Sequence, residues 1–366
     1  MALQEVCILG HTGNVGQELV SQIVRHDKHG HRNPTRIVGL VNSRAHILDP
    51  RGIDDPLRLT DRSTFSAEAL PHGDLREVVT KVQELGLSGE VVFVDVTADG
   101  SKRMLEVHKM IRSSREKMVT ANKSPLALFA TEDFRRLTSE PGLYRYNASV
   151  MAGGDAIPYL QDAQCINDPV SGLEGCFSGT LGYITSHLEK GEKPFSRIVA
   201  EAYEQKYTEP HPWDDLNGLD VARKLLILAR TAGFDVSLKD VDLRPLIPAE
   251  YGKIADVREF LRALEAEDDA FARRAEAARK EGKALRYVAS LESNGEPRLS
   301  VGLREVEKTD LLGQLEGTAN LVRIVTRDRA PASSPHIIIA KGAGIEKTAA
   351  AVRADMAKFL PNLRID

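Results

Sequence analysis

Short apolar runs alternate with amphipathic stretches through the first 150 residues, and this alternation constrains the fold more than any other feature of the sequence. The runs are continuous, as in strands buried on both faces, and the first and third are followed by stretches with helical spacing. Five runs are predicted to be strands: "VCILG", "RIVGLVNS", "VVFVDVT", "KMVTANK" and "LYRYNASV". This order predicts an α/β fold with a Rossmann-type, doubly wound parallel sheet.

The sequence changes in character near residue 150, so we expect two domains. After this point the strand-like runs alternate apolar and polar residues, which predicts an α+β domain with an antiparallel sheet. The tail "HIIIAKGAGIEKTAAAVRADMAKFL" is predicted to return to the first domain as a buried strand, a glycine turn and a helix. We therefore predict a first domain of residues 1–150 completed by 335–366, with a loop insertion over 49–66, and a second domain of residues 151–334.

The overall composition argues against several classes of partner. A net charge of -4 gives no electrostatic reason to bind nucleic acid or an acidic membrane. No apolar run approaches the roughly 20 residues that span a bilayer, and the N-terminus lacks the basic region and cleavage site of a signal peptide. The three cysteines form neither a paired framework nor a metal spacing, so we expect a cytoplasmic protein with reduced thiols.

The segment "ILGHTGNVGQEL" places three glycines between the first predicted strand and its helix. Glycine lets the backbone approach a pyrophosphate closely, and the free N–H groups at the start of a helix favour negative charge. The spacing is G-x-x-G-x-x-G rather than the commoner G-x-G-x-x-G, and the alternative is a tight turn that binds nothing. The dinucleotide site is predicted at Gly10, Thr12, Gly13, Asn14, Val15 and Gly16.

Further candidate cofactor contacts follow the next predicted strands. The second strand ends in "LVNSR" without the carboxylate that usually binds a ribose 2′-hydroxyl, and Ser43 and Arg44 suit a 2′-phosphate instead. This favours NADP over NAD, although an exposed arginine at a strand end is commonplace. Thr97 and Lys123 end the third and fourth strands, at the edge where open α/β sheets bind ligands. The alternative for Lys123 is a surface lysine in a loop.

Many charges stand at the start of an apolar helical pattern in "YTEPHPWDDLNGLDVARKLLILA", residues 207–229. Asp214 or Asp215 is a suitable N-cap, which predicts a helix from there to about Thr231. Asp220 and Lys224 share one face of this helix, either as a surface ion pair or in a cleft. Apolar residues on the same face favour the cleft. A cluster of carboxylates and an amine there suits a small zwitterionic substrate such as an amino acid.

The same segment, extended to "YTEPHPWDDLNGLDVARKLLILAR", is very similar to the substrate-site segment of homoserine dehydrogenases. "FSGTLGYI" resembles that family's second-domain signature, "TANK" and "NSRA" match its first-domain loops, and "KGAG…KTAAAVRAD" resembles its return to the cofactor domain. The matches span nearly the whole chain in the expected order. The chain is identified as a member of this family, in the monofunctional form without a C-terminal regulatory domain.

This resemblance implies a reversible reaction between L-homoserine and L-aspartate 4-semialdehyde with NADP or NAD, in the aspartate pathway to threonine and methionine. It implies Lys224 as the proton donor in the reducing direction, Lys123 as a second catalytic lysine, and a homodimer formed through the second domain's sheet. Thr97 and Gly344 are implied cofactor contacts. The implied substrate-binding residues are Glu209, Asp215, Asp220, Gly179, Thr180 and Tyr207.

One loop departs from the family pattern. The family's "VGAGLP" loop, which holds a monovalent cation through backbone carbonyls, is replaced here by the longer "VMAGGDAIP", and Asn147 stands where a carboxylate is common. The resemblance implies a Na⁺ or K⁺ site at Asn147, Val150, Ala152 and Gly154.

Two other functions stay open from the sequence. The glycine turn "GHTGNVG" resembles that of aspartate-semialdehyde dehydrogenases, which acylate a catalytic cysteine, and Cys176 is the candidate nucleophile in the second domain. A non-catalytic NADP-sensing protein is the other alternative. It is disfavoured because a binding module needs none of Glu209, Asp220, Lys224 and Lys123.

Overall fold

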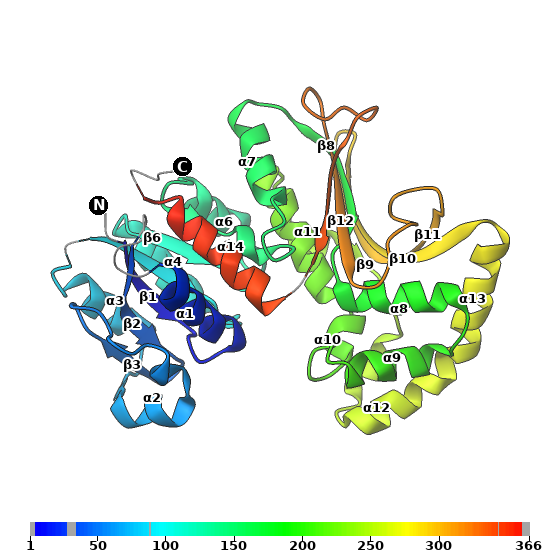
Figure 1. Cartoon of the computed structure of the whole chain (residues 1–366). Helices are drawn as coiled ribbons and strands as arrows, with labels where there is room; N and C mark the ends of the chain where they lie inside the picture. Colours follow the sequence, from blue (N-terminus) through cyan, green and yellow to red (C-terminus); the bar gives the residue numbers. More distant parts are fainter. Residues whose placement is uncertain (1–3, 28–33, 88, 343, 361–366) are drawn as a thin grey trace. The chain divides into compact units, whose positions relative to one another are not determined.

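The computed structural model describes residues 4–27, 34–87, 89–342 and 344–360. The chain divides into two compact units, and the first is formed by two separate segments. Residues 1–153 and 344–366 make the first unit, and residues 154–343 make the second (Figure 1).

The first unit is built on a seven-stranded sheet with the order β4-β3-β2-β1-β5-β6-β7. The strands from β2 to β7 in this order are parallel, and β3 and β4 extend the β2 edge in antiparallel pairing. A mostly parallel sheet buried on both faces is what the continuous apolar runs predicted. The strands are β1 (Gln4–Leu9), β2 (Thr35–Val41), β3 (Ala45–Leu48), β4 (Leu70–Pro71), β5 (Glu90–Asp95), β6 (Lys117–Thr120) and β7 (Tyr144–Arg145).

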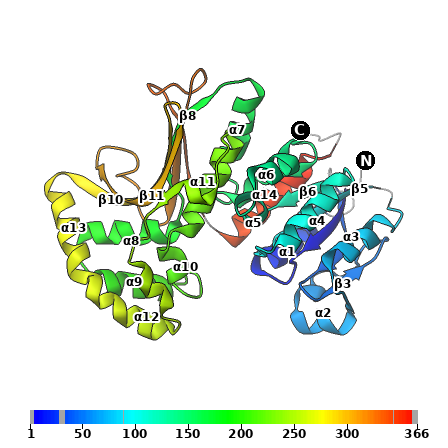
Figure 2. The ribbon, with the colours of Figure 1, turned by 180° about the vertical axis from the view of Figure 1, so that it is seen from behind.

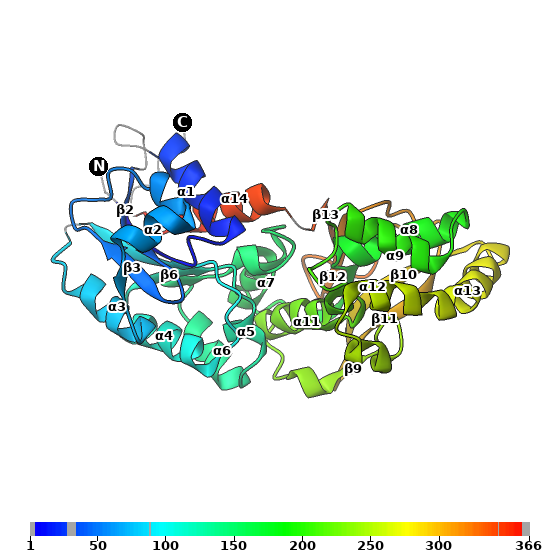
Figure 3. The same ribbon diagram turned by 90° about the horizontal axis from the view of Figure 1, so that it is seen from below.

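Helices cover both faces of this sheet. Figure 3 shows α1 and α14 on one face and α3, α4 and α6 on the other, and Figure 2 presents the second group from the front. The helical segments are α1 (Asn14–His26), η1 (Arg58–Thr60), α2 (Arg62–Glu68), α3 (Leu75–Gln83), α4 (Lys102–Ser113), α5 (Ser124–Ala127), α6 (Thr131–Thr138), η2 (Asn147–Ser149) and α14 (Ile345–Ala357).

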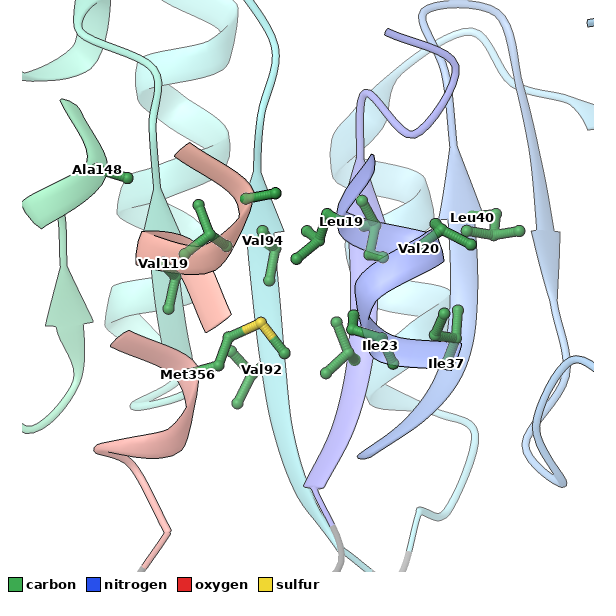
Figure 4. Close-up of a cluster of buried hydrophobic side chains, with 14 of the residues drawn as sticks. Leu19, Val20, Ile23, Ile37, Leu40, Val92, Val94, Val119, Ala148 and Met356 are labelled. Atoms are coloured by element: carbon green, nitrogen blue, oxygen red, sulfur yellow. The ribbon is translucent and has the colours of Figure 1, made fainter. Parts of the chain in front are cut away.

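Apolar packing holds the C-terminal helix α14 in the first unit. Side chains of α1 and α14, among them Leu19, Ile23 and Met356, lie with Val92 and Val94 of β5 in one buried cluster (Figure 4). Burial of a side chain of this size stabilises the fold by roughly 1.5–3 kcal/mol. The cluster therefore joins the start and the end of the chain into one unit.

The second unit is built on a six-stranded sheet with the order β13-β12-β8-β10-β11-β9. All neighbours are antiparallel except β11 and β9. The strands are β8 (Val170–Cys176), β9 (Val241–Leu243), β10 (Lys283–Ser293), β11 (Pro297–Glu307), β12 (Ala319–Thr326) and β13 (His336–Lys341).

Helices α7 and α11 pack against each other, and α11 also contacts β10 and β11 (Figure 2). Among the described residues, no helix combines the length and the apolar character that crossing a membrane requires. The helical segments of this unit are α7 (Ala156–Cys165), α8 (Gly179–Lys190), α9 (Phe195–Glu204), α10 (Trp213–Leu216), α11 (Leu219–Thr231), η3 (Leu238–Asp240), η4 (Ala249–Lys253), α12 (Val257–Ala263), η5 (Leu264–Glu267) and α13 (Asp268–Lys280).

Two expectations about the fold are wrong. The strand at 336–341 does not return to the first sheet, because it pairs with β12 along its whole length as an edge of the second sheet. Only the helix α14 returns, so the first unit resumes at Gly344 rather than at 335. The supposed loop insertion over 49–66 contains η1 and most of α2, whose N-cap Asp61 accepts from the backbone N–H of Thr64 at 2.9 Å.

Candidate active site

The charged segment of the second unit forms two helices rather than the single predicted one. The short helix α10 ends at Leu216, and Gly218 then adopts a left-handed backbone with φ of +73° before α11 begins. A β-carbon at Gly218 would lie 2.0 Å from the hydroxyl oxygen of Tyr287, so only glycine fits. The break puts Asp220 in the first turn of α11, where the helix dipole favours a carboxylate.

Asp220 and Lys224 form an ion pair between a largely buried amine and a carboxylate whose side chain is 39% exposed. The Lys224 Nζ lies 2.7 Å from the Asp220 Oδ2 and donates to the carbonyl oxygen of Phe177 at 2.7 Å. Lys224 is only 9% exposed, unlike a solvated surface lysine. An ammonium has three N–H donors, so these two contacts leave one for a ligand. The loop between β8 and α8, which contains Phe177, thus fixes the amine.

Asp215 lies beside this pair and is the most perturbed acid of the second unit's charged segment. Its Oδ2 accepts from the backbone N–H of Glu209 at 2.8 Å. The pKa of Asp215 is raised to about 6, chiefly by burial; the carboxylates of Glu209 and Asp220 contribute to the rise, and the hydrogen bonds to Asp215 oppose it. Three carboxylates therefore stand near one ammonium, which leaves an excess of negative charge suited to binding a cationic group.

The remaining substrate candidates surround the same carboxylates. Thr180, in the first turn of α8, donates to the carbonyl oxygen of Tyr207 at 2.6 Å, and its hydroxyl also neighbours Asp215. Tyr207 is 44% exposed, and its ring packs against the ring of Tyr183. Gly179 and Thr180 start an α-helix, where backbone N–H groups lack intrahelical acceptors and suit a carboxylate. The structure thus places Gly179, Thr180, Tyr207, Glu209, Asp215, Asp220 and Lys224 in one part of the second unit.

In the first unit, the glycine turn has the backbone that close approach requires. Gly10 has φ of +91°, and a β-carbon there would lie 2.9 Å from Cγ2 of Thr97. A β-carbon at Gly16 would lie 2.3 Å from the carbonyl oxygen of Gly10. Gly13 caps α1 and is exposed, with Thr12, Asn14 and Val15 beside it. The turn therefore leaves an open helix start at the carboxyl end of β1.

The next two parallel strands, β5 and β6, bring further predicted cofactor residues to the carboxyl end of the sheet. Thr97 follows β5, and Lys123 follows β6 as the N-cap of α5. Their loops are joined by Asn122, whose Nδ2 donates to the hydroxyl oxygen of Thr97 at 3.2 Å. Because β1, β5 and β6 are adjacent and parallel, their carboxyl ends lie side by side. The glycine turn, Thr97 and Lys123 therefore lie together at the carboxyl ends of these strands.

Ser43 and Arg44 lie in the turn between β2 and β3, and both are exposed. The Oδ1 of Asn42 accepts from the backbone N–H groups of Arg44 and Ala45, each at 2.8 Å, and fixes this turn. The turn belongs to the strand next to β1, whose last residue Val41 accepts from the N–H of Gly10 at 2.8 Å. Gly344 is the N-cap residue of α14, with φ of +146°.

The four residues predicted to hold a cation lie where the chain leaves the first unit. Asn147, Val150 and Ala152 belong to the first unit and Gly154 begins the second. Among the described residues, no group of three or more histidine, cysteine, aspartate or glutamate side chains is placed to hold a metal ion. The loop is marked by a run of positive φ values at Met151, Ala152, Gly153 and Asp155.

Two residues that contribute to these sites were not predicted. Phe177 acts through its backbone oxygen, which has no side-chain signature in a sequence. Asn122 lies in the "TANK" motif next to Lys123. A side-chain amide at the end of a strand was the sequence feature that could have identified it.

Comparisons with known proteins agree with this arrangement. A model of the homoserine dehydrogenase family matches residues 157–357. The chain is 32% identical to a homoserine dehydrogenase of Schizosaccharomyces pombe over 98% of this chain and 96% of that protein. A solved Candida auris protein of unknown function is 28% identical and covers 99% of both chains with a TM-score of 0.87. A hyperthermophilic archaeal homoserine dehydrogenase solved with NADPH shares the fold, with 19% identity, a TM-score of 0.72, and cover of 99% of this chain and 100% of that one.

A parallel sheet with a glycine turn after its central strand, and a second unit with a buried lysine among carboxylates, define an NAD(P)-dependent oxidoreductase. The family match covers more than half of the chain, and the yeast relative is matched over almost its full length. The chain belongs to the homoserine dehydrogenase family.

Proposed function

We propose that Lys224 moves the proton in the reversible conversion of L-homoserine to L-aspartate 4-semialdehyde. The observation that carries this proposal is the buried ammonium held by Asp220 and the Phe177 carbonyl, with one donor left over. In the oxidising direction the neutral Lys224 amine accepts the hydroxyl proton as the carbon–oxygen double bond forms. In the reducing direction the ammonium returns that proton to the alkoxide oxygen. The bound nicotinamide supplies or accepts the hydride.

The carboxylates near Lys224 would bind the other charged end of the substrate. Asp215 and Glu209 suit the α-ammonium group, because ionised carboxylates accept strong hydrogen bonds from it. The backbone N–H groups of Gly179 and Thr180 suit the α-carboxylate. Asp220 orients the Lys224 amine.

An assay of homoserine-dependent NADP⁺ and NAD⁺ reduction tests this proposal. Homoserine should support reduction of the cofactor, and aspartate 4-semialdehyde should support oxidation of the reduced cofactor without phosphate. Phosphate-dependent reduction of NADP⁺ by the semialdehyde would instead indicate the acylating enzyme. Absence of both reactions in a protein that binds the cofactor would indicate a sensor.

The acylating alternative makes a separate prediction for Cys176. This thiol lies in β8 and is 4% exposed, and burial raises its pKa to about 12. A nucleophilic cysteine needs a thiolate near neutral pH, so Cys176 is suited to a structural role. Cys176→Ser should retain homoserine oxidation within about threefold of the wild-type kcat, since no proton-transfer step uses it. Loss of turnover in a folded variant that still binds NADP⁺ would support the cysteine mechanism.

We propose that the first unit binds NADP in preference to NAD. The exposed Arg44 lies in the β2–β3 turn, where a carboxylate for the ribose 2′-hydroxyl is absent from the "NSR" sequence. The NADPH complex of the archaeal fold relative supports binding of a nicotinamide dinucleotide by this fold.

Arg44→Ala should weaken NADP⁺ binding by about 10- to 100-fold and leave NAD⁺ binding nearly unchanged. The reason is the loss of a charge-assisted contact worth about 1.5–3 kcal/mol. Dissociation constants for both cofactors measure the effect. The control is Arg76→Ala, which removes an exposed arginine paired with Asp74 at the start of α3. Equal weakening of both cofactors by Arg44→Ala would contradict the assignment.

We propose that residues 147–154 can hold a monovalent cation through backbone carbonyl groups. The positive φ values in this loop change the direction of successive carbonyl groups. The Val150 carbonyl accepts from the N–H of Gly153 at 3.1 Å, and the Met151 carbonyl lies 3.5 Å from Lys347 Nζ. The Lys347 ammonium already supplies positive charge to this loop, so we assign no chemical step to a cation.

We also propose a homodimer and a cytoplasmic location. The edge strand β13 exposes Ile339 by 57%, which suits an interface formed by the second sheet. The cysteines Cys7, Cys165 and Cys176 are free thiols, as a reducing compartment would keep them. A mass measured in solution tests the dimer.

A further inference from the structure

A chain of buried polar groups lies beneath the strand ends that carry Thr97 and Lys123. It runs from Tyr144 on β7 through His108 on α4 to Asp95 on β5, and then to Asn122 after β6. The first three side chains are fully buried, and Asn122 is 3% exposed. Burying four polar side chains costs stability unless each is hydrogen-bonded, and each of these four has a hydrogen-bond partner within the group.

Asp95 fixes the direction of one hydrogen bond in this network. A carboxylate only accepts, so the Nε2 of His108 carries a proton and donates to Oδ2 of Asp95 at 3.0 Å. The Nδ1 of His108 lies 2.7 Å from the hydroxyl oxygen of Tyr144, and this hydrogen bond holds the other side of the imidazole ring. The Asp95 Oδ1 accepts from the backbone N–H of Thr97 at 2.8 Å. The Asp95 carboxylate is thus fixed on both oxygens.

Asp95 in turn fixes the amide of Asn122. A carboxylate only accepts, so the Nδ2 group of Asn122 must face β5, where it also donates to the carbonyl oxygen of Asp99 at 2.9 Å. The Oδ1 then faces the other way and accepts from the backbone N–H of Ser124 at 3.0 Å. This bond spans Lys123 and closes an Asx-turn around its backbone.

We propose that Asn122 is a positioning residue, which holds Lys123 at the carboxyl edge of the first unit's sheet in register with Thr97. Tyr144, His108 and Asp95 set the orientation of its amide from below. The inference rests on the proposed function and on the second catalytic lysine, Lys123, that the family resemblance implies. It follows from geometry because one amide side chain links the loop after β5 to the backbone that carries the lysine.

Asn122→Asp tests the inference with almost no change in shape. The carboxylate keeps the acceptor for the N–H of Ser124 but loses both donors toward β5 and places a negative charge against Asp95. We expect kcat to fall on the order of tenfold or more, as for displacements of a reacting group by a fraction of an ångström. The KM for homoserine should stay within about threefold, since its proposed contacts are in the second unit.

The matched control is Gln4→Glu. Gln4 is 1% exposed, belongs to the same unit, and donates one buried amide hydrogen bond to the carbonyl oxygen of Met356 at 2.8 Å at the opposite end of the sheet. It undergoes the same change from amide to carboxyl and should lose stability while kcat is preserved. An equal kcat in Asn122→Asp and Gln4→Glu would overturn the proposal.

A double-mutant cycle separates this proposal from the role of Lys123 itself. Lys123→Met should lower kcat, and adding Asn122→Asp should lower it no further, because Asn122 acts through the lysine. Additive losses would overturn the positioning role while leaving Lys123 catalytic. A normal kcat in Lys123→Met would overturn both roles, yet homoserine oxidation through Lys224 would stand. Asn122→Ser, which keeps a short acceptor, serves the same cycle where the aspartate variant does not fold.

Discussion

Lys224→Met should lower kcat for homoserine oxidation by about 10²- to 10⁴-fold, the range that general acid–base catalysis contributes. Methionine fills the same largely buried space, so the loss should come from the missing proton carrier rather than from a cavity. NADP⁺ binding should be unchanged, because the residues proposed to bind the cofactor belong to the other unit. Steady-state rates, cofactor dissociation constants and melting temperatures measured on one preparation decide the matter.

The control for this prediction is another lysine with the same spacing from its partner. Lys280 lies 2.8 Å from Glu276 across one turn of α13, and its side chain is 73% exposed. Such surface pairs contribute about 0–1 kcal/mol, so Lys280→Met should change neither stability nor kcat measurably. A kcat within threefold of wild type in Lys224→Met would remove this lysine from the mechanism and leave Lys123 as the proton carrier.

The buried position of Lys224 was predictable because the signal is local. Ile227 shares a helical face with Asp220 and Lys224, and the structure confirms that Lys224 and Ile227 are buried on it. Leu216, also expected on this face, is buried but ends α10 before the break, so it is not part of α11. The parallel sheet was predictable for the same reason, since a strand buried on both faces has a continuous run of apolar residues in its own sequence.

The features that the sequence did not predict depend on distant partners. At the helix break, glycine is required at position 218 because Tyr287 of β10 occupies the space of a side chain. The strand β13 has the apolar run of a buried parallel strand, but pairing with β12 decides its sheet. The carbonyl of Phe177 accepts from Lys224 across 47 residues of sequence. The spacing of apolar residues within one segment does not predict contacts with residues far away in the sequence.

Asp215→Asn should lower kcat/KM for homoserine by about 10- to 100-fold at pH 8, because the α-ammonium loses a contact to a charged group worth about 1.5–3 kcal/mol. The wild-type enzyme should show the same loss on acidification. With a pKa of about 6, Asp215 is increasingly protonated below that pH, and kcat/KM should then fall up to tenfold per pH unit. The variant should lack this acidic limb.

The same substitution should stabilise the fold, which distinguishes a binding residue from a structural one. The pKa of Asp215 is raised above its unfolded value of 3.8, so the folded state binds the proton more tightly. Stability is therefore lost as pH rises from about 4 to about 6 and stays lower above that range, by up to roughly 3 kcal/mol for a two-unit shift. Asp215→Asn should raise the melting temperature at pH 8 and leave it nearly unchanged at pH 4.

The exposed neighbour Asp214, in the same short helix, provides the control, since Asp214→Asn should alter neither kcat/KM nor the pH dependence of stability. A variant of Asp215 that is destabilised at pH 8 would show that the carboxylate supports the fold. A variant that is stabilised but binds homoserine normally would show that another group receives the ammonium, with Glu209 the next candidate. Stabilisation together with weakened homoserine binding is the expected result. Partial burial of the Asp215 carboxylate next to Glu209 and Asp220 destabilises the folded protein, so its contribution is to ligand binding rather than to the fold.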